Sequence, residues 1–121
     1  MIKSYKDLKV YQLSYNLAME IFWLTKKFPK EEQYSLTDQI RRASRSITTN
    51  IVEGWSKRYY ENIFKRHLLD AIGSCDESKV WLNLCYDCKY ITEEEFYNFL
   101  NRYEELSKML NSLFDNWSTF K

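Results

Sequence analysis

The sequence has little of the material from which β-sheets, membrane spans and secretion signals are built. Its 121 residues include only two glycines and one proline, which leaves few tight turns and favours helices over a sheet of many strands. No segment reaches the roughly 18 consecutive apolar residues that a membrane-spanning helix needs, and the first residues contain no apolar run of signal-peptide length. We therefore expect a cytoplasmic protein without a membrane partner.

Cysteine and histidine are also scarce. Three cysteines, an odd number, fall within residues 75–88, and His67 is the sole histidine. This pattern is typical of free thiols in a reducing compartment and not of a disulfide framework. Cys75 and Cys85 would lie roughly 15 Å apart along a helix axis, so one helix cannot gather four zinc ligands. We expect no metal site, with Cys75, Cys85 and Cys88 serving as core or interface thiols.

Sequence signatures of catalysis are missing as well. Gly54 and Gly73 stand alone, so there is no glycine-rich phosphate loop, and no paired His-Glu zinc-protease motif occurs. Neither a serine nor a cysteine is spaced to make a recognisable nucleophile motif with His67. The sequence therefore predicts no enzyme, no cofactor and no small-molecule substrate. The remaining enzymatic alternative is a site in which His67 meets carboxylates through the fold alone.

Apolar and aromatic residues are plentiful, at 45% and 17% of the chain, and helix-capping patterns divide them into segments. In a capping box, a serine or threonine is followed three residues later by an acidic side chain. Three pairs have this spacing: Ser4 with Asp7, Ser35 with Asp38, and Thr92 with Glu95. We predict an all-α, antiparallel up-and-down four-helix bundle, a single domain over residues 1–121 with helices at about 5–28, 36–56, 60–89 and 93–117.

The predicted helices differ in how much of their surface is apolar. Helix 93–117 has one apolar stripe, whereas helix 5–28 has a core stripe and further apolar residues on the opposite side. A bundle covers one face of each helix, so the second face needs a partner unless its aromatic rings lie flat on a monomer surface. We predict self-association through these candidate interface residues of the first and third helices: Tyr11, Tyr15, Met19, Phe22, Trp23, Leu69, Val80, Trp81 and Leu84.

Positive charge is unevenly distributed although the formal net charge is only +1. Residues 1–30 carry six lysines against two acidic residues, whereas residues 71–121 carry five basic and nine acidic residues. Arginines of helix 36–56 point away from its core stripe and are suited to phosphate contact. The candidate nucleic-acid-binding residues are Arg41, Arg42, Arg45, Lys57, Arg58, Lys65 and Arg66. A solvated face or pairing between subunits is the alternative, because Asp38 lies at helical spacing from two of these arginines.

The segment from Phe28 to Gly54 contains Phe-Pro-Lys-Glu-Glu, Tyr-Ser-Leu-Thr-Asp-Gln-Ile-Arg-Arg-Ala-Ser-Arg-Ser-Ile and Asn-Ile-Val-Glu-Gly. With the opening Tyr-Lys-Asp-Leu-Lys-Val-Tyr-Gln, it closely resembles the four-helix-bundle proteins encoded by intervening sequences within 23S ribosomal RNA genes. The resemblance implies an up-and-down bundle that assembles as a homopentamer. That family is similar in turn to the accessory variability proteins of diversity-generating retroelements, whose basic pentamer works with a reverse transcriptase and nucleic acid.

The family pattern falls on these residues: Gln39, Arg41, Arg42, Ser46, Asn50, Glu53, Gly54 and Glu77. We expect Gln39, Asn50, Glu53 and Glu77 to be structural polar residues, with Asn50 and Glu53 held in a hydrogen-bonded junction. The combined expectation is a non-enzymatic homo-oligomer, pentameric by resemblance, that acts as a scaffold or binding protein. Its candidate ligand is structured RNA or DNA, held by the basic face of helix 36–56. The alternative is a protein-interaction module that recruits a partner polypeptide without nucleic acid.

Overall fold

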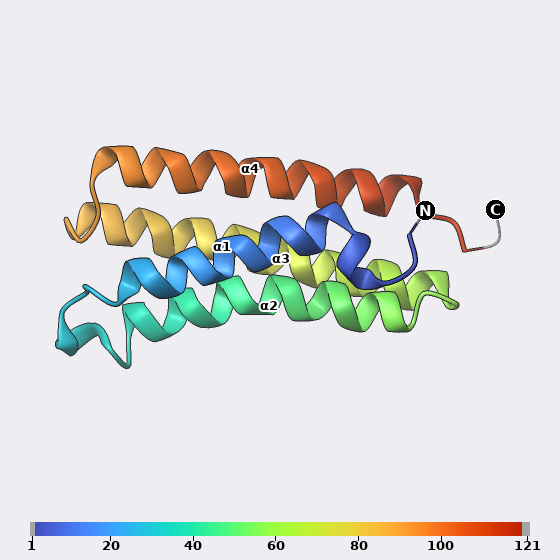
Figure 1. Cartoon of the computed structure of the whole chain (residues 1–121), viewed down its shortest axis with the longest axis horizontal. Helices are drawn as coiled ribbons and strands as arrows, with labels where there is room; N and C mark the ends of the chain where they lie inside the picture. The colour runs from blue at the N-terminus through green and yellow to red at the C-terminus, as the bar shows by residue number, and fades with distance from the viewer. Residues whose placement is uncertain (1, 120–121) are drawn as a thin grey trace.

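The computed structural model describes residues 2–119 and shows four long helices laid side by side (Figure 1). In chain order the elements are η1 (Tyr5–Asp7), α1 (Lys9–Thr25), η2 (Lys30–Glu32), α2 (Leu36–Ser56), α3 (Glu61–Asp87) and α4 (Glu93–Asn116), where η marks a short 3-10 helix. Contacts join each long helix to the next in sequence and, more sparsely, α4 to α1. The prediction of an all-α four-helix bundle in a single domain is confirmed, and residues 2–119 contain no strand.

The order of contacts places α1 and α3 at opposite corners of the bundle. In the part of the chain that the structure describes, these two helices share no close backbone contact. Figure 1 shows the same arrangement, with α1 in front of α3, α4 above and α2 below. The outer faces of α1 and α3 therefore point to different sides of the molecule.

Two of the predicted capping boxes are present. The Ser4 hydroxyl accepts a hydrogen bond from the N–H of Lys6, while Asp7 accepts one from the N–H of Ser4 at 3.1 Å. This box begins η1 and not the long helix. At α4, the hydroxyl of Thr92 and the carboxylate of Glu95 each accept a hydrogen bond from the other's backbone N–H, at 3.1 and 2.9 Å.

The prediction of a third capping box at Ser35 is wrong. The Ser35 hydroxyl donates to the carboxylate of Glu32 and makes no cap bond to α2. Glu32 also accepts from the N–H of Leu36 at 3.4 Å, so a carboxylate from the preceding η2 takes the place of the expected cap. Spacing alone did not distinguish a serine that accepts from the helix from one that donates to a nearer carboxylate.

The first helix is shorter than the predicted 5–28. Leu8 is extended, with φ −73° and ψ 127°, and buries its side chain, so α1 begins at Lys9. At the other end, α1 stops at Thr25, and Pro29 follows a short turn. The helix predicted for residues 60–89 corresponds to α3, which ends at Asp87. Lys89 then takes a left-handed conformation with φ 64°. A left-handed residue after the last turn closes a helix, and lysine stands here where glycine is commoner.

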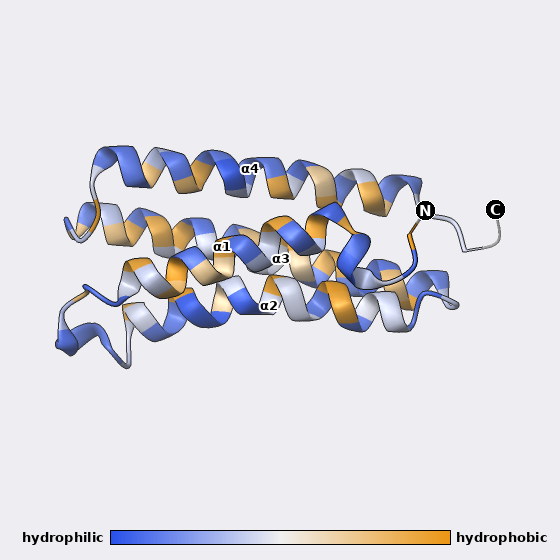
Figure 2. Cartoon of the chain, in the orientation of Figure 1, coloured by the Kyte–Doolittle hydropathy of each residue, from blue (hydrophilic) through white to orange (hydrophobic). Residues whose placement is uncertain are grey.

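One core runs along the bundle axis, and its most buried large side chains include Tyr103, Phe64 and Leu17. Figure 2 shows apolar residues on all four helices, while hydrophilic residues cover much of α4 in this view. Burial raises the pKa of the Cys85 thiol to about 12 and also raises that of Cys75. Both thiols therefore stay protonated at neutral pH and pack as small apolar groups.

The contact between α2 and α3 is the most extensive in the bundle. A Cβ added at Gly54 would lie 2.8 Å from the Cβ of His67 and 3.0 Å from a ring carbon of Phe64. Further along the same contact, the Ser74 hydroxyl donates to that of Ser46 at 2.9 Å. Small residues let these two backbones approach each other. The serine hydroxyl groups between them form a hydrogen bond with each other.

Long charged side chains bridge α1, and the turn that follows it, to α4. Arg102 of α4 donates from both of its terminal nitrogens to the carboxylate of Glu20 on α1. The ammonium group of Lys27 lies 3.0 Å from the carboxylate of Glu95. None of the helices within residues 2–119 is both long and apolar enough to cross a bilayer.

Candidate functional site

The structure divides the seven candidate nucleic-acid-binding residues into two groups at different ends of the bundle. Arg41, Arg42 and Arg45 lie in the first half of α2, next to the end of α1. The other group surrounds the turn between α2 and α3, and consists of Lys57, Arg58, Lys65 and Arg66. Arg41 and Lys57 are sixteen residues apart on one helix, which is about 24 Å. The seven candidate residues, predicted to lie near one another, are therefore not brought together in one surface.

Arg41 is half-buried and held against α1. Its Nε donates to the hydroxyl of Thr25 at 2.8 Å, and its Nη2 to the carbonyl oxygen of Phe22 at 3.5 Å. Its guanidinium carbon also lies 4.9 Å from the centre of the Phe22 ring. The side chain is thus anchored within the protein, yet among the described residues no carboxylate neutralises it.

Most of the other candidate cations also have partners within the chain. Arg42 pairs with Asp38 at 2.9 Å. Lys57 and Lys65 each lie 3.9 Å from a glutamate one helical turn earlier, and Arg58 covers the ring of Trp55 at 4.2 Å. In residues 2–119, Arg45 and Arg66 are exposed and have no carboxylate within ion-pair distance. Sequence spacing identified the cations but not these pairings.

Apolar residues of α1 form an exposed surface beside α2, which we call the α1 face: Tyr15, Ala18, Met19, Phe22 and Trp23. Trp23 is 64% exposed and Tyr15 48%. Between the two helices the surface dips into a cavity of about 290 Å³, lined by most of these residues and by Arg45, Thr48 and Thr49 of α2. Tyr11, also predicted for an interface, is half-buried and packs edge-on against Tyr5.

Positive charge in the α1 face is concentrated around Phe22. Three cations surround its ring, with Lys26 at 4.7 Å, Arg41 at 4.9 Å and Arg45 at 6.0 Å from the ring centre. Cations are attracted to the electron-rich face of an aromatic ring. One end of the α1 face is therefore strongly basic.

A second exposed apolar surface, which we call the α3 face, consists of Leu69, Gly73, Val80 and Leu84. Val80 is 57% exposed and Leu69 54%, and a Cβ added at Gly73 would meet nothing within 4 Å. Acidic residues interrupt and flank this surface: Asp70, Asp76, Glu77 and Asp87. Trp81, predicted as an interface residue with these, is half-buried against the core instead. Seven of the nine predicted interface residues thus divide between two faces on opposite corners, and Tyr11 and Trp81 belong to neither face.

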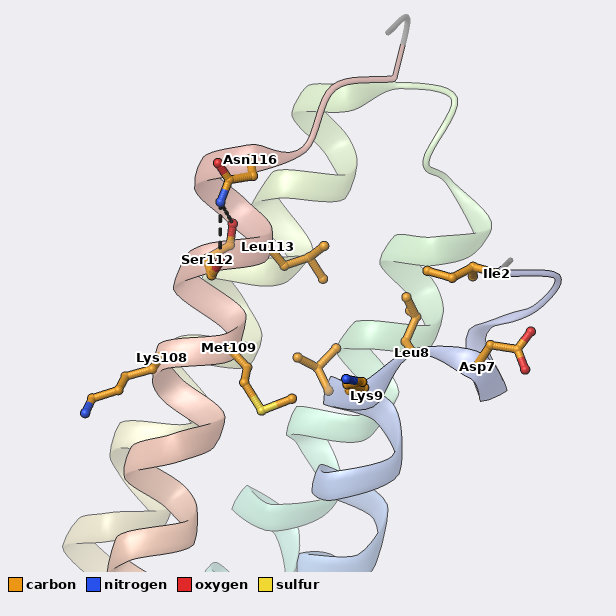
Figure 3. Close-up of a pocket in the computed structure, with 10 residues that line it drawn as sticks. Ile2, Asp7, Leu8, Lys9, Lys108, Met109, Ser112, Leu113 and Asn116 are labelled. Atoms are coloured by element: carbon orange, nitrogen blue, oxygen red, sulfur yellow. Dashed lines mark hydrogen bonds between the residues drawn. The ribbon is translucent and has the colours of Figure 1, made fainter.

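A third apolar surface is a cleft between the start of α1 and the end of α4, and the sequence did not predict it. It is open to solvent, has a volume of about 650 Å³ and is lined mainly by Ile2, Leu8, Val10, Met109 and Leu113. Figure 3 shows Met109 and Leu113 of α4 pointing toward Leu8, while Lys108 turns outward. Leu8 precedes α1 in an extended conformation, and Ile2 of the N-terminal segment completes the lining. Helical periodicity could not reveal the cleft.

Of the four predicted structural polar residues, the structure supports one. Asn50 donates to the carbonyl oxygen of Ser46 at 3.0 Å, and its side-chain oxygen lies 3.2 Å from Nδ1 of His67. Gln39, Glu53 and Glu77 are exposed. They lie on the outer arcs of α2 and α3, and Asn50 bonds to Ser46 and His67 instead of forming the predicted junction with Glu53.

His67 is partly buried at the α2–α3 contact, where Asn50 orients its ring. Nδ1 must carry the proton if it donates to the Asn50 oxygen, which leaves Nε2 as an acceptor. Cys75 and Cys85 are buried and Cys88 is exposed. Among the described residues, no three histidine, cysteine or acidic side chains are grouped to hold a metal ion.

Comparisons with known proteins place the chain in a family. A sequence profile described as 23S rRNA-intervening sequence protein matches residues 6–112. A similar crystal structure is that of a protein with unknown function from the S23 ribosomal protein family of Bacteroides thetaiotaomicron. It is 29% identical, with a TM-score of 0.80 over 88% of this chain and 96% of that chain. No curated protein matches the sequence. The chain belongs to the 23S rRNA-intervening sequence protein family.

Proposed function

We propose that the protein is a non-enzymatic scaffold that functions as a homo-oligomer, with a pentamer as the expected stoichiometry. The observation that carries the proposal is the presence of two exposed apolar faces on opposite corners of one small bundle. Soluble proteins usually cover apolar surfaces of this kind with a partner. The pentamer rests on the resemblance of the sequence to proteins that assemble in that way.

Charge favours contact between unlike faces of neighbouring copies. The α1 face has Lys26, Arg41 and Arg45 around Phe22. Asp70, Glu77 and Asp87 lie in and around the α3 face, together with Asp76, which is paired with Lys79. Like faces would repel, and an α1 face against an α3 face would attract. A head-to-tail contact of this kind repeats from copy to copy and can close into a ring.

Native mass spectrometry of two single variants and of their mixture tests the proposal. Met19→Glu places a charge in the α1 face and Val80→Glu one in the α3 face. With head-to-tail contacts each variant alone is a monomer, and an equimolar mixture forms a one-to-one heterodimer from the two intact faces. Tyr97→Glu, at an exposed tyrosine of α4, is the control that keeps the wild-type assembly.

A monomeric wild-type protein at micromolar concentration would overturn self-association. If each variant instead forms a homodimer and mixing gives no new species, the oligomer stands but its contacts join like faces. A monomer that captures a defined polypeptide in a nuclease-resistant manner would favour the alternative, a protein-interaction module.

We further propose structured RNA or DNA as the ligand of the first half of α2. The observation that favours it is the group of cations around Phe22 that no carboxylate of the described chain neutralises. Phosphate contacts release counterions, so binding should weaken steeply as salt rises. Arg45→Glu should remove most of the binding of a structured RNA, also when it is compared with Met19→Glu, which disrupts the same α1 face without removing a cation. Arg66→Glu at the other end of the bundle serves as the matched control. Equal loss in both variants, or no binding at low salt, would reject this ligand.

A further inference from the structure

A polar cavity of about 220 Å³ lies where the end of α1, the turn after it and the start of α2 meet. Its wall includes the side chains of Lys26, Lys30, Arg41 and Thr37. None of the three cations has a carboxylate within ion-pair distance among residues 2–119. The cavity is separate from the dip in the α1 face, which lies further along the bundle.

The acidic residues nearby are Glu31, Glu32 and Asp38, and none of them lines the cavity. The carboxylate of Glu32 accepts hydrogen bonds from Ser35, from the N–H of Leu36 and from the Tyr90 hydroxyl at 2.8 Å. Asp38 is paired with Arg42, and Glu31 is exposed. These acidic residues therefore do not reach the cavity, and no carboxylate in its wall neutralises the three cations.

Arg41 is preorganised for a ligand. Its bonds to Thr25 and Phe22 use Nε and one N–H of Nη2, which leaves three of its five N–H donors without a partner in the described chain. Lys26 lies over the same Phe22 ring as Arg41. Two positive charges beside one ring repel each other, and an anion bound between them would offset this electrostatic repulsion.

Thr37, another residue of the wall, has a hydroxyl without a partner in the described chain. Thr37 is only 5% exposed, and its Oγ1 makes no hydrogen bond within the protein. A buried hydroxyl of this kind normally has a partner, and its desolvation is otherwise uncompensated. Thr37 stands in the first turn of α2, where the helix dipole adds positive potential.

We infer that this cavity is a binding site for a phosphate-type oxyanion, held by Arg41, Lys26 and Lys30 with Thr37 as a further hydrogen-bond donor. The site deepens the nucleic-acid part of the proposed function and does not depend on self-association. The oxyanion is a terminal phosphate, a backbone phosphodiester or a free phosphate ion. All three present the same oxygens to the cavity.

Isothermal titration calorimetry on the full chain at low ionic strength tests the site, with inorganic phosphate as the first probe. Wild type should bind phosphate in the millimolar range. Thr37→Val should weaken binding about tenfold, because a hydrogen bond to a charged group is lost. The same change should raise the melting temperature of the free protein by a few degrees, because it removes an unpaired buried hydroxyl.

A second variant addresses charge. Lys26→Ala with Lys30→Ala should also weaken phosphate binding by about tenfold. Lys27→Ala is the matched control, since Lys27 is next to Lys26 but pairs with Glu95 at 3.0 Å and does not line the cavity. Circular dichroism of every variant establishes that it is folded.

Two short RNAs, one with a 5′-phosphate and one with a 5′-hydroxyl, identify the source of the oxyanion. Tighter binding of the first indicates a terminal phosphate, and equal binding above that of inorganic phosphate indicates the backbone. If neither exceeds inorganic phosphate, the ligand is a free phosphate ion.

The site is rejected if wild type binds none of the probes, if Thr37→Val leaves binding unchanged, or if Lys27→Ala loses as much as the double variant. Native mass spectrometry of the same samples separates this result from self-association. Loss of phosphate binding with an unchanged oligomer concerns the cavity alone, and the response of RNA binding to Arg45→Glu is measured independently.

Discussion

The α2–α3 contact and the α1–α4 contact are the two extremes of the same bundle. At the first, Gly54 brings two backbones so close that an added Cβ would lie 2.8 Å from His67. At the second, Arg102 and Glu20 reach across between the helices, and further along a cleft of about 650 Å³ remains (Figure 3). Small residues therefore specify a closed contact, while long charged side chains hold a contact that opens at one end.

The largest effect should follow from a methyl group at the closed contact. Gly54→Ala places a Cβ against His67 and Phe64, and overpacking of this kind costs about 2 kcal/mol. Urea unfolding measures the change, in the Val80→Glu background so that the α3 face is uncovered. The matched control is Gly73→Ala, where a Cβ meets open space and higher helix propensity should stabilise the chain by about 0.5–1 kcal/mol. If both substitutions changed the free energy of unfolding in the same direction, the α2–α3 contact would not be specified by the small residue at Gly54.

A smaller loss should come from the polar groups of the closed contact. Asn50→Ala removes the bonds to Ser46 and His67 and should cost about 1 kcal/mol. Asn101→Ala, at an exposed asparagine of α4, is the control and should change the free energy of unfolding by less than about 0.5 kcal/mol. An equal response at the two asparagines would show that the hydrogen bonds at the closed contact contribute nothing.

The charged contact should contribute less than either. A double-mutant cycle with Glu20→Gln and Arg102→Gln isolates the pair, and we expect a coupling of about 0.5 kcal/mol, since both side chains are partly exposed. The coupling should shrink in 1 M salt. A salt-independent value would mean that packing, and not charge, joins α1 to α4.

The smallest effect concerns the bundle end at which α1 and α4 lie close together. Hydrogen bonds from Ser35 and Tyr90 hold the pKa of Glu32 below its usual value of 4.5. Because the folded-state pKa is the lower one, this stabilisation is present above pH 4.5 and is lost as pH falls through the folded value. Tyr90→Phe should therefore be less stable than wild type at pH 7, and the difference should diminish on acidification. A difference that is constant between pH 7 and pH 3 would contradict the assignment.

Much of the fold could be predicted because its signals are local. Capping at Thr92 and the one-sided pattern of α4 require only neighbouring residues, and both agree with the structure. Ser35 shows the limit, since its role depended on Glu32 in a separate turn. The end of α3 could not be predicted accurately either, because Lys89 adopts the left-handed conformation that glycine usually takes at the end of a helix.

The candidate site could be predicted only in part, because surfaces depend on how helices are placed. The sequence identified the exposed apolar residues of α1 and α3, such as Trp23 and Val80, but not that their faces point to opposite sides. It identified Arg41 as a cation but not its anchorage to Phe22 and Thr25. Glu77 matched a family pattern and was predicted to be a structural polar residue, yet it is exposed on an outer arc of α3.

The order in which the helices touch also bears on how the chain folds. Each of the stronger contacts joins helices that are consecutive in sequence, and only the sparse α1–α4 contact joins the two ends of the chain. Contacts between near neighbours close short loops, which gives a low contact order and folding within microseconds to milliseconds. The docking of α1 against α4 would then be the final step, and amide hydrogens beside the cleft should be the first to exchange with solvent.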